Sequence, residues 1–187
     1  GLEMARAAKA AGLPAQVTIS AAFGCPFEGE VAPAKVIALA QALAEGEPIE
    51  IAIADSIGAG VPSQVTDLVG RLREALPGMR LRCHFHNTRN TGIANAFAAV
   101  EAGVEVLDAS IGGIGGCPFA PAATGNIPTE DLLYMLTRMG IEVVIARGAG
   151  CCGALTHHMG RHDPAMASAR ANIEAWHSDL KAAVGEG

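Results

Sequence analysis

Short runs rich in β-branched residues alternate with alanine- and leucine-rich stretches of helical spacing along most of this chain. Strands that alternate with helices predict a parallel sheet with right-handed crossovers, which is an α/β fold. Four or five such units are too few to close an eight-stranded barrel, so the sequence predicts a partial (β/α)₈ barrel, its C-terminal half. The expected strands are 17–20, 50–55, 80–86, 104–111 and 142–146, and the expected helices are 33–44, 64–76, 91–103 and 129–139.

Residues with known preferences for helix ends mark several of these boundaries. Pro33 suits a first helical turn, and Ser63 and Thr129 are candidate N-caps. Gly103 is a candidate C-cap, because glycine accepts the left-handed conformation that often ends a helix. Together these residues favour short connections between successive units.

Composition narrows the class of protein. The 187 residues suit one domain, or one domain with a small appendage, and half of them are apolar. The formal charge of −6, without a Lys/Arg cluster, argues against binding to nucleic acid or to an anionic membrane surface. No apolar run reaches the roughly 18 residues of a membrane span, and the first residues do not resemble a signal peptide. Five cysteines without disulfide-framework spacing favour a reduced, cytoplasmic protein.

The residues with the clearest chemical potential follow the third and fourth expected strands. His84 and His86 are two positions apart, so their imidazoles project from the same face of a strand, and neutral imidazoles bind divalent metals. A glycine run at 112–116 leads to Cys117, and the carboxamide of Asn126 follows. This pattern predicts a metal site beneath a mobile thiol acid, as in a metal-assisted lyase.

Less specific interpretations compete with each of these residues. An isolated His-x-His pair is more often structural than a metal ligand, and an isolated cysteine is more often inert. Asp55 could either work in the site or cap the turn before Gly58. Cys25 and Cys83 are expected to be small core or turn residues. The glycine run resembles a phosphate-binding loop only superficially, because no Lys-Ser/Thr follows it.

From about residue 5 to about residue 140 the chain resembles the C-terminal half of hydroxymethylglutaryl-CoA lyase, in the DRE-TIM metallolyase family. The glycine loop, with Cys-Pro-Phe-Ala at 117–120 and Gly-Asn at 125–126, is the most diagnostic part of the match. The other matching stretches are Ala22–Val31, Ala54–Gly58, His84–Arg89, Asp108–Ser110 and Thr129–Leu132.

The resemblance implies a role for each candidate residue. His84, His86 and Asn126 would bind a divalent cation, Mg²⁺ or Mn²⁺, while Cys117 would be the catalytic cysteine of the loop. Asp55 would be the acidic partner near the substrate, and His84 would also carry a proton. The implied substrate is an acyl-CoA, 3-hydroxy-3-methylglutaryl-CoA, which the family cleaves into acetyl-CoA and acetoacetate.

Two departures from the family pattern affect this expectation. The family's first strand carries an Arg-Asp pair whose aspartate binds the metal, and this sequence has no counterpart of that strand. Asn90 stands where the family usually has glycine. Half a barrel also exposes two sheet edges, which predicts self-association or a homodimer, and full activity is expected only when the missing segment is supplied.

The tail resembles a different family. Residues 148–155 contain Cys151-Cys152-Gly153 and are similar to the Cys-Cys-Gly region of the iron–sulfur subunit of glycolate oxidase. The sequence therefore predicts a lyase-like domain over 1–141 and a separate tail over 142–187. Two adjacent cysteines cannot fill the four thiolate positions of an ordinary cluster. An iron–sulfur redox module and a non-catalytic fragment remain the alternatives to a lyase.

Overall fold

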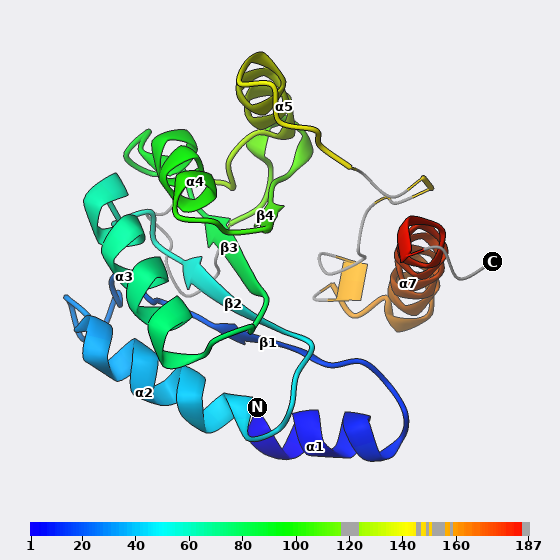
Figure 1. The fold of residues 1–187 in the computed structure, drawn as a ribbon. Coiled ribbons are helices and arrows are strands. Elements are labelled where there is room, and N and C mark those ends of the chain that lie inside the picture. The colour runs from blue at the N-terminus through cyan, green and yellow to red at the C-terminus, as the bar shows by residue number, and fades with distance from the viewer. Residues whose placement is uncertain (117–123, 145–146, 149, 151–155, 158, 185–187) are drawn as a thin grey trace. The chain divides into compact units, whose positions relative to one another are not determined.

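A computed structural model describes residues 1–116, 124–144, 147–148, 150, 156–157 and 159–184, without the side chains of 176–184 (Figure 1). The chain divides into two compact units, Gly1–Ile141 and Glu142–Gly187. The first unit contains the sheet and every residue of the candidate site that the structure describes. The second contains the long helix α7, His162–Val184.

The first unit is built on a four-stranded parallel sheet. The strands β1 (Gln16–Ile19), β2 (Glu50–Asp55), β3 (Leu81–Phe85) and β4 (Val106–Asp108) lie side by side in chain order. Each is paired in parallel with the next, which confirms the α/β prediction. Within the described residues, β1 and β4 have no further strand partner, so both form edges of the sheet.

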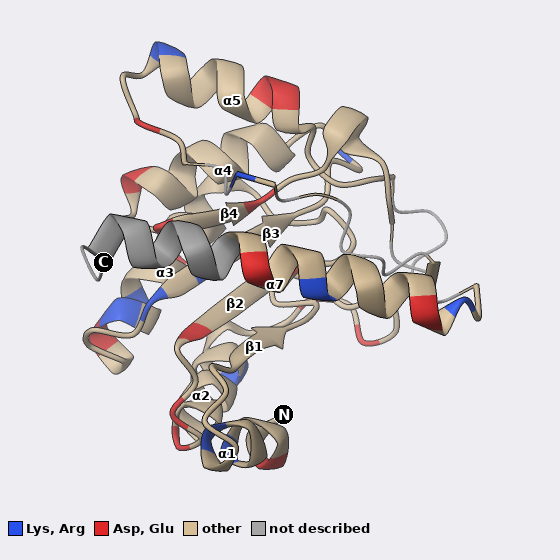
Figure 2. Cartoon of the chain, turned by 90° about the vertical axis from the view of Figure 1, so that its right-hand side faces the viewer, with Lys and Arg blue, Asp and Glu red and all other residues tan. Residues whose placement is uncertain are grey.

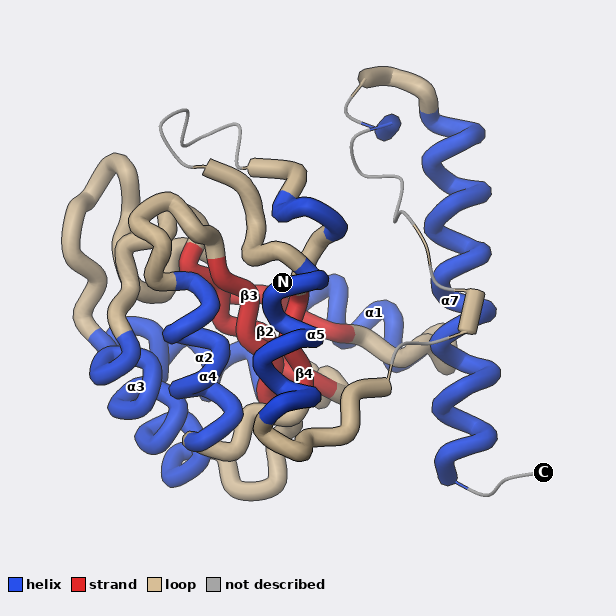
Figure 3. Tube along the Cα trace, turned by 90° about the horizontal axis from the view of Figure 1, so that it is seen from above, coloured by secondary structure: helices blue, strands red, loops and turns tan. Residues whose placement is uncertain are grey.

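Helices precede, connect and follow the strands. They are α1 (Leu2–Ala10), α2 (Pro33–Ala44), α3 (Pro62–Ala75), α4 (Gly92–Glu101) and α5 (Thr129–Arg138), with a short 3₁₀ turn, η1, at Ile111–Gly113. Figures 1 and 3 both show α2, α3 and α4 together beside the strands. The repeated strand–helix order is that of consecutive barrel units.

The core forms between the sheet and these helices because side chains alternate along each strand. Leu81, Cys83 and Phe85 of β3 are buried, whereas Arg82 and His84 between them are only half-buried. On α3, four apolar residues at helical spacing complete the core: Val65, Leu68, Val69 and Leu72. Alternation on β3 therefore sends apolar side chains to the helices and chemically active ones to the other face.

Some predicted boundaries are wrong. Helix α3 begins at Pro62 after Val61, so Ser63 is not its N-cap; instead the Gln64 side chain accepts a hydrogen bond from the Val61 N–H at 3.2 Å. Helix α5 begins at Thr129 itself, after Pro128. The fifth strand does not form over 142–144, and residues 145–146 lie outside the described residues.

Charges at the ends of α5 match its macrodipole. Glu130 and Asp131 occupy the first turn and Arg138 the last, and Figure 2 shows acidic and basic colouring at opposite ends of the helix. Among the described helices, none is both long and apolar enough to cross a membrane.

Candidate active site

Strand β3 carries the histidine pair at its carboxyl end. His84 and His86 lie on the same face, as the spacing predicts, with ring centroids 5.2 Å apart. His86 is only 5% exposed, whereas the His84 side chain is 28% exposed. The carboxyl ends of parallel strands are where barrel enzymes place their active sites.

Asn126 is brought to this pair by the chain that returns from the glycine loop. The Asn87 N–H donates to the Gly125 carbonyl at 3.0 Å, and the Ile127 N–H donates to the Phe85 carbonyl at 3.2 Å. These bonds form an isolated antiparallel bridge between His86 and Asn126. Residues that are far apart in the sequence thus become direct neighbours.

Two buried polar atoms at this bridge lack partners. Asn126 donates from Nδ2 to the Ile114 carbonyl at 2.9 Å, which orients its amide. Its Oδ1 and the Nδ1 of His86 are buried, and neither has a hydrogen-bond partner among the described residues. Buried polar atoms are nearly always satisfied in folded proteins. An imidazole nitrogen and an amide oxygen left in this state fit the donor set expected for a divalent cation.

Close backbone contacts explain the glycines around Asn126. A Cβ added at Gly125 would lie 1.8 Å from the Gly113 carbonyl oxygen, and one at Gly113 would lie 2.8 Å from the Asn126 carbonyl oxygen. Gly113 and Gly115 also have φ angles of +68° and +98°. The glycine run therefore lets two limbs of the loop pack against each other and hold Asn126 beside β3.

A charged network links His84 to the neighbouring strands. The His84 Nδ1 lies 3.4 Å from Oδ2 of Asp108, its register partner on β4. Arg82 donates from Nη1 to Asp108 Oδ1 and from Nε to Glu50 Oε1, both at 2.6 Å. The Glu50 side chain is only 4% exposed, so this carboxylate depends on its arginine partners.

Burial and neighbouring charges shift three pKa values here. Burial lowers the pKa of His86, and the nearby His84 lowers it further, against a smaller opposing effect of Asp55. Burial alone would raise the pKa of Asp108, but His84 and Arg82 together lower it. Burial opposes the charge of Arg82 as well, yet Asp108 and Glu50 raise its pKa overall. The site therefore favours a neutral His86 beside an ionised Asp108.

Asp55 is fully buried at the end of β2 and is bound to the backbone. Its Oδ1 accepts the Ala59 N–H at 2.9 Å, and its Oδ2 accepts the Gly60 N–H at 2.8 Å. The structure thus shows the turn-capping role that the sequence left open, and the catalytic role of Asp55 stays a prediction. Cys117 lies outside the described residues.

The loops after β2 and β3 are tied to each other. Arg89 donates to the Gly58 carbonyl at 2.9 Å, and the buried Asn95 donates to the Gly60 carbonyl at 2.9 Å. Asn90 takes a left-handed φ of +56°, so it adopts the glycine-like conformation that its position requires. Sequence reasoning missed Asn95, although a polar residue on the apolar face of a predicted helix was the available signal.

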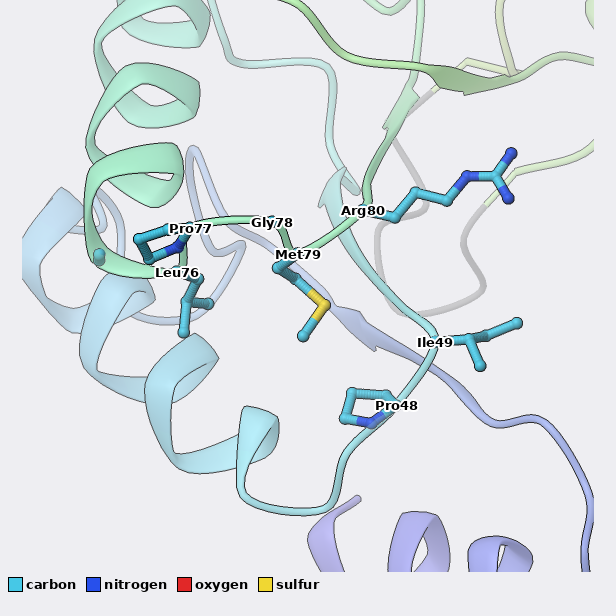
Figure 4. Close-up of a pocket in the computed structure, with 8 residues that line it drawn as sticks. Pro48, Ile49, Leu76, Pro77, Gly78, Met79 and Arg80 are labelled. Carbon is cyan, nitrogen blue, oxygen red and sulfur yellow. The ribbon is translucent and has the colours of Figure 1, made fainter.

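No cluster of three His, Cys, Asp or Glu side chains suitable for a metal occurs within the described part of the chain. The candidate ligand set depends on an amide oxygen instead. A shallow hollow at the opposite, amino ends of β2 and β3 has a lining of both polar and apolar atoms (Figure 4). It is lined by Pro48, Ile49 and residues 75–80.

A parallel sheet of consecutive βα units with polar residues at its carboxyl edge defines a partial barrel with the site location of barrel enzymes. Comparison with known families agrees, because the HMGL-like family model matches residues 3–149. The chain therefore belongs to the HMGL-like family.

The names of individual relatives are those of lyases for CoA thioesters. The chain is 45% identical over 157 residues to (R)-citramalyl-CoA lyase of Chloroflexus aurantiacus, covering 83% of this chain and 50% of that protein. It is 38% identical over 159 residues to mitochondrial hydroxymethylglutaryl-CoA lyase of Bos taurus, covering 82% and 49%. The chain thus spans about half the length of these relatives.

Solved structures show the same relationship. The HMG-CoA lyase of Bacillus subtilis matches with a TM-score of 0.71 and 40% identity over 76% of this chain and 48% of its own. The Acinetobacter baumannii HMG-CoA lyase, solved with coenzyme A and 3-methylmalate, matches with a TM-score of 0.71 and 38% identity, covering 77% and 47%.

The resemblance of the tail to an iron–sulfur subunit is not borne out by these comparisons. The HMGL-like match itself continues to residue 149. Cys151, Cys152 and His158 lie outside the described residues.

Proposed function

We propose that this chain supplies part of the active site of a metal-dependent carbon–carbon lyase that cleaves 3-hydroxy-3-methylglutaryl-CoA to acetyl-CoA and acetoacetate. The observation that carries the proposal is the bridge between His86 and Asn126, beside which a buried nitrogen and a buried oxygen have no hydrogen-bond partner among the described residues. Membership of the HMGL-like family supports the same chemistry.

His84, His86 and Asn126 would hold the cation, Mg²⁺ or Mn²⁺. When bound, a divalent cation would polarise the hydroxyl and carboxylate oxygens of the substrate and fix their orientation. The three side chains carry no negative charge in their neutral forms, whereas hard cations favour carboxylate ligands. A carboxylate from outside this chain would therefore complete the site.

Cleavage of a β-hydroxy thioester moves two protons. One leaves the tertiary hydroxyl as the carbon–carbon bond breaks, and we assign its acceptance to Nε2 of the partly exposed His84 at the stage when that nitrogen is not bound to the cation. The other goes to the carbon of the emerging enolate, and we assign it to the thiol of Cys117. Asp55 would act as the acidic partner near the substrate while it orders the turn after β2.

A second acyl-CoA is also a candidate for the substrate. The relative at 45% identity is named for (R)-citramalyl-CoA, and the Acinetobacter structure contains coenzyme A with 3-methylmalate. These names support an acyl-CoA substrate with a hydroxyl group β to the thioester. Both thioesters should therefore be assayed side by side.

The two edges of the sheet suggest what completes the enzyme. Strands β1 and β4 have unpaired edges within the described part of the chain, and this chain covers only 48% of the Bacillus subtilis structure. We propose that a segment equivalent to the uncovered half of these relatives, or a second copy of this chain, pairs with these edges. Cysteine usage supports a cytoplasmic setting for the protein.

The test measures acetyl-CoA release from both thioesters, with Mg²⁺ or Mn²⁺ and with or without a polypeptide equivalent to the uncovered half. Activity should require the metal and disappear in His86→Ala and Cys117→Ala, while the exposed Glu105→Gln should behave like the parent. A well-folded chain that takes up no Mn²⁺ by calorimetry, either alone or with that polypeptide, would contradict the proposal.

A further inference from the structure

The network around Asp108 does more than neutralise charge. Arg82, His84 and His86 share one face of β3, and Asp108 on β4 lies level with His84 in the register. One carboxylate oxygen of Asp108 accepts from Arg82 at 2.6 Å, and the other lies 3.4 Å from the His84 Nδ1. Both oxygens of one carboxylate are thus committed to different partners.

The position of this carboxylate is fixed from a third strand. Arg82 is held at its Nε by Glu50 of β2, whose second oxygen lies 3.6 Å from Arg80. Glu50 is buried, so the arginine has little freedom to leave Asp108. A chain of contacts therefore runs from Glu50 on β2 through Arg82 on β3 to Asp108 on β4. From Asp108 it returns to His84 on β3.

We propose that Asp108 is a positioning residue that keeps the proton of neutral His84 on Nδ1, so that Nε2 presents its lone pair to the cation or the substrate. Histidines that bind metals commonly donate their other N–H to a carboxylate, which fixes both the tautomer and the ring orientation. The part that concerns the cation rests on the proposed function, whereas the tautomer does not.

Replacing Asp108 by asparagine gives a sharp test because of Arg82. The guanidinium needs an acceptor, so the amide oxygen of D108N will face Arg82 and its NH₂ group will face the His84 Nδ1. That nitrogen must then accept a hydrogen bond, and the proton moves to Nε2. The isosteric change is thus expected to reverse the tautomer while the fold stays intact.

The experiment uses the full, metal-free chain labelled with ¹⁵N at its six histidines, at a pH where the imidazoles are neutral. Signals of His84 are assigned by their loss in His84→Gln. We expect the parent to show a protonated Nδ1 at His84, D108N to show a protonated Nε2, and the control Glu105→Gln to match the parent. Glu105 is a suitable control because its side chain is 60% exposed and it contacts Arg80 rather than His84.

A parent chain with the proton on the Nε2 of His84 would overturn the inference, even if D108N failed to fold. An unchanged tautomer in folded D108N would overturn it as well. Mn²⁺ titration followed by electron paramagnetic resonance gives the second readout, with affinity expected to fall about 10–100-fold in D108N. If the parent binds no Mn²⁺ but shows the expected tautomers, the proposed function fails and the role of Asp108 stands.

Discussion

Gly125→Ala is the substitution that most directly tests how the loop builds the site. The new Cβ would lie 1.8 Å from the Gly113 carbonyl oxygen, whereas real Cβ atoms essentially never come closer than 3.0 Å to such an atom. The two limbs must therefore separate by about 1.2 Å. One atom is a backbone oxygen and the other is a Cβ, whose position does not depend on the side-chain rotamer. No rotamer change can therefore relieve the overlap.

The consequences can be estimated separately for stability and for metal binding. Overpacking costs about 1–3 kcal/mol, and a backbone overlap belongs at the upper end of that range. Metal–ligand distances vary by only about 0.2 Å, and the separation of the two limbs is much larger than that. It would therefore remove Asn126 as a ligand. We expect Mn²⁺ affinity to fall at least about tenfold.

Urea unfolding and Mn²⁺ calorimetry on the same preparations provide the measurements. Gly70→Ala is the matched control, because Gly70 lies inside α3 and an added Cβ there meets no atom within 4 Å. It should raise stability by about 0.5–1 kcal/mol and leave metal affinity unchanged. Parent-like stability and affinity in Gly125→Ala would refute the argument from loop packing.

Three further predictions concern the sheet. Arg82→Met should lower the free energy of unfolding in urea by about 3 kcal/mol, because it leaves the buried Glu50 short of a partner. Adding Glu50→Gln should recover part of the loss, and additive effects of the two substitutions would contradict the pairing. Burial raises the pKa of the Cys83 thiol, so mass spectrometry should find Cys25 alkylated in the folded protein well before Cys83. Because the pKa of His86 is lowered in the folded protein, the unfolded chain binds a proton at this imidazole at a higher pH than the folded one does. The free energy of unfolding should therefore fall as the pH drops below the ordinary value of 6.5, and its slope against pH should be smaller in His86→Gln.

Local patterns predicted much of the fold because each unit is defined by neighbouring residues. The alternation on β3 and the helical spacing on α3 place apolar residues on one side without long-range information. The exact helix starts differed because Pro62 can begin a helix that Ser63 was expected to cap. The fifth strand was wrong, since 142–144 form no strand in the described part of the chain.

The site was only partly predictable for a physical reason. Spacing alone places His84 and His86 on one face, whereas the bridge to Asn126 depends on how a distant loop returns. The role of Asp108 depends on register, because only the pairing of β3 with β4 sets it level with His84. The backbone bonds that Asp55 accepts likewise depend on the geometry of its own turn, which the sequence alone does not determine.

The return of residues 125–127 to β3 has a consequence for the order of folding. Each strand pairs with its neighbour in the chain, so the sheet is dominated by contacts of modest sequence separation, which form early. Asn126 comes after β1 to β4 in the chain, so its bridge to His86 can close only once those strands have been synthesised. A polypeptide emerging from the ribosome would therefore gain the proposed ligand Asn126 only after its sheet, and metal capture would report that this bridge had closed.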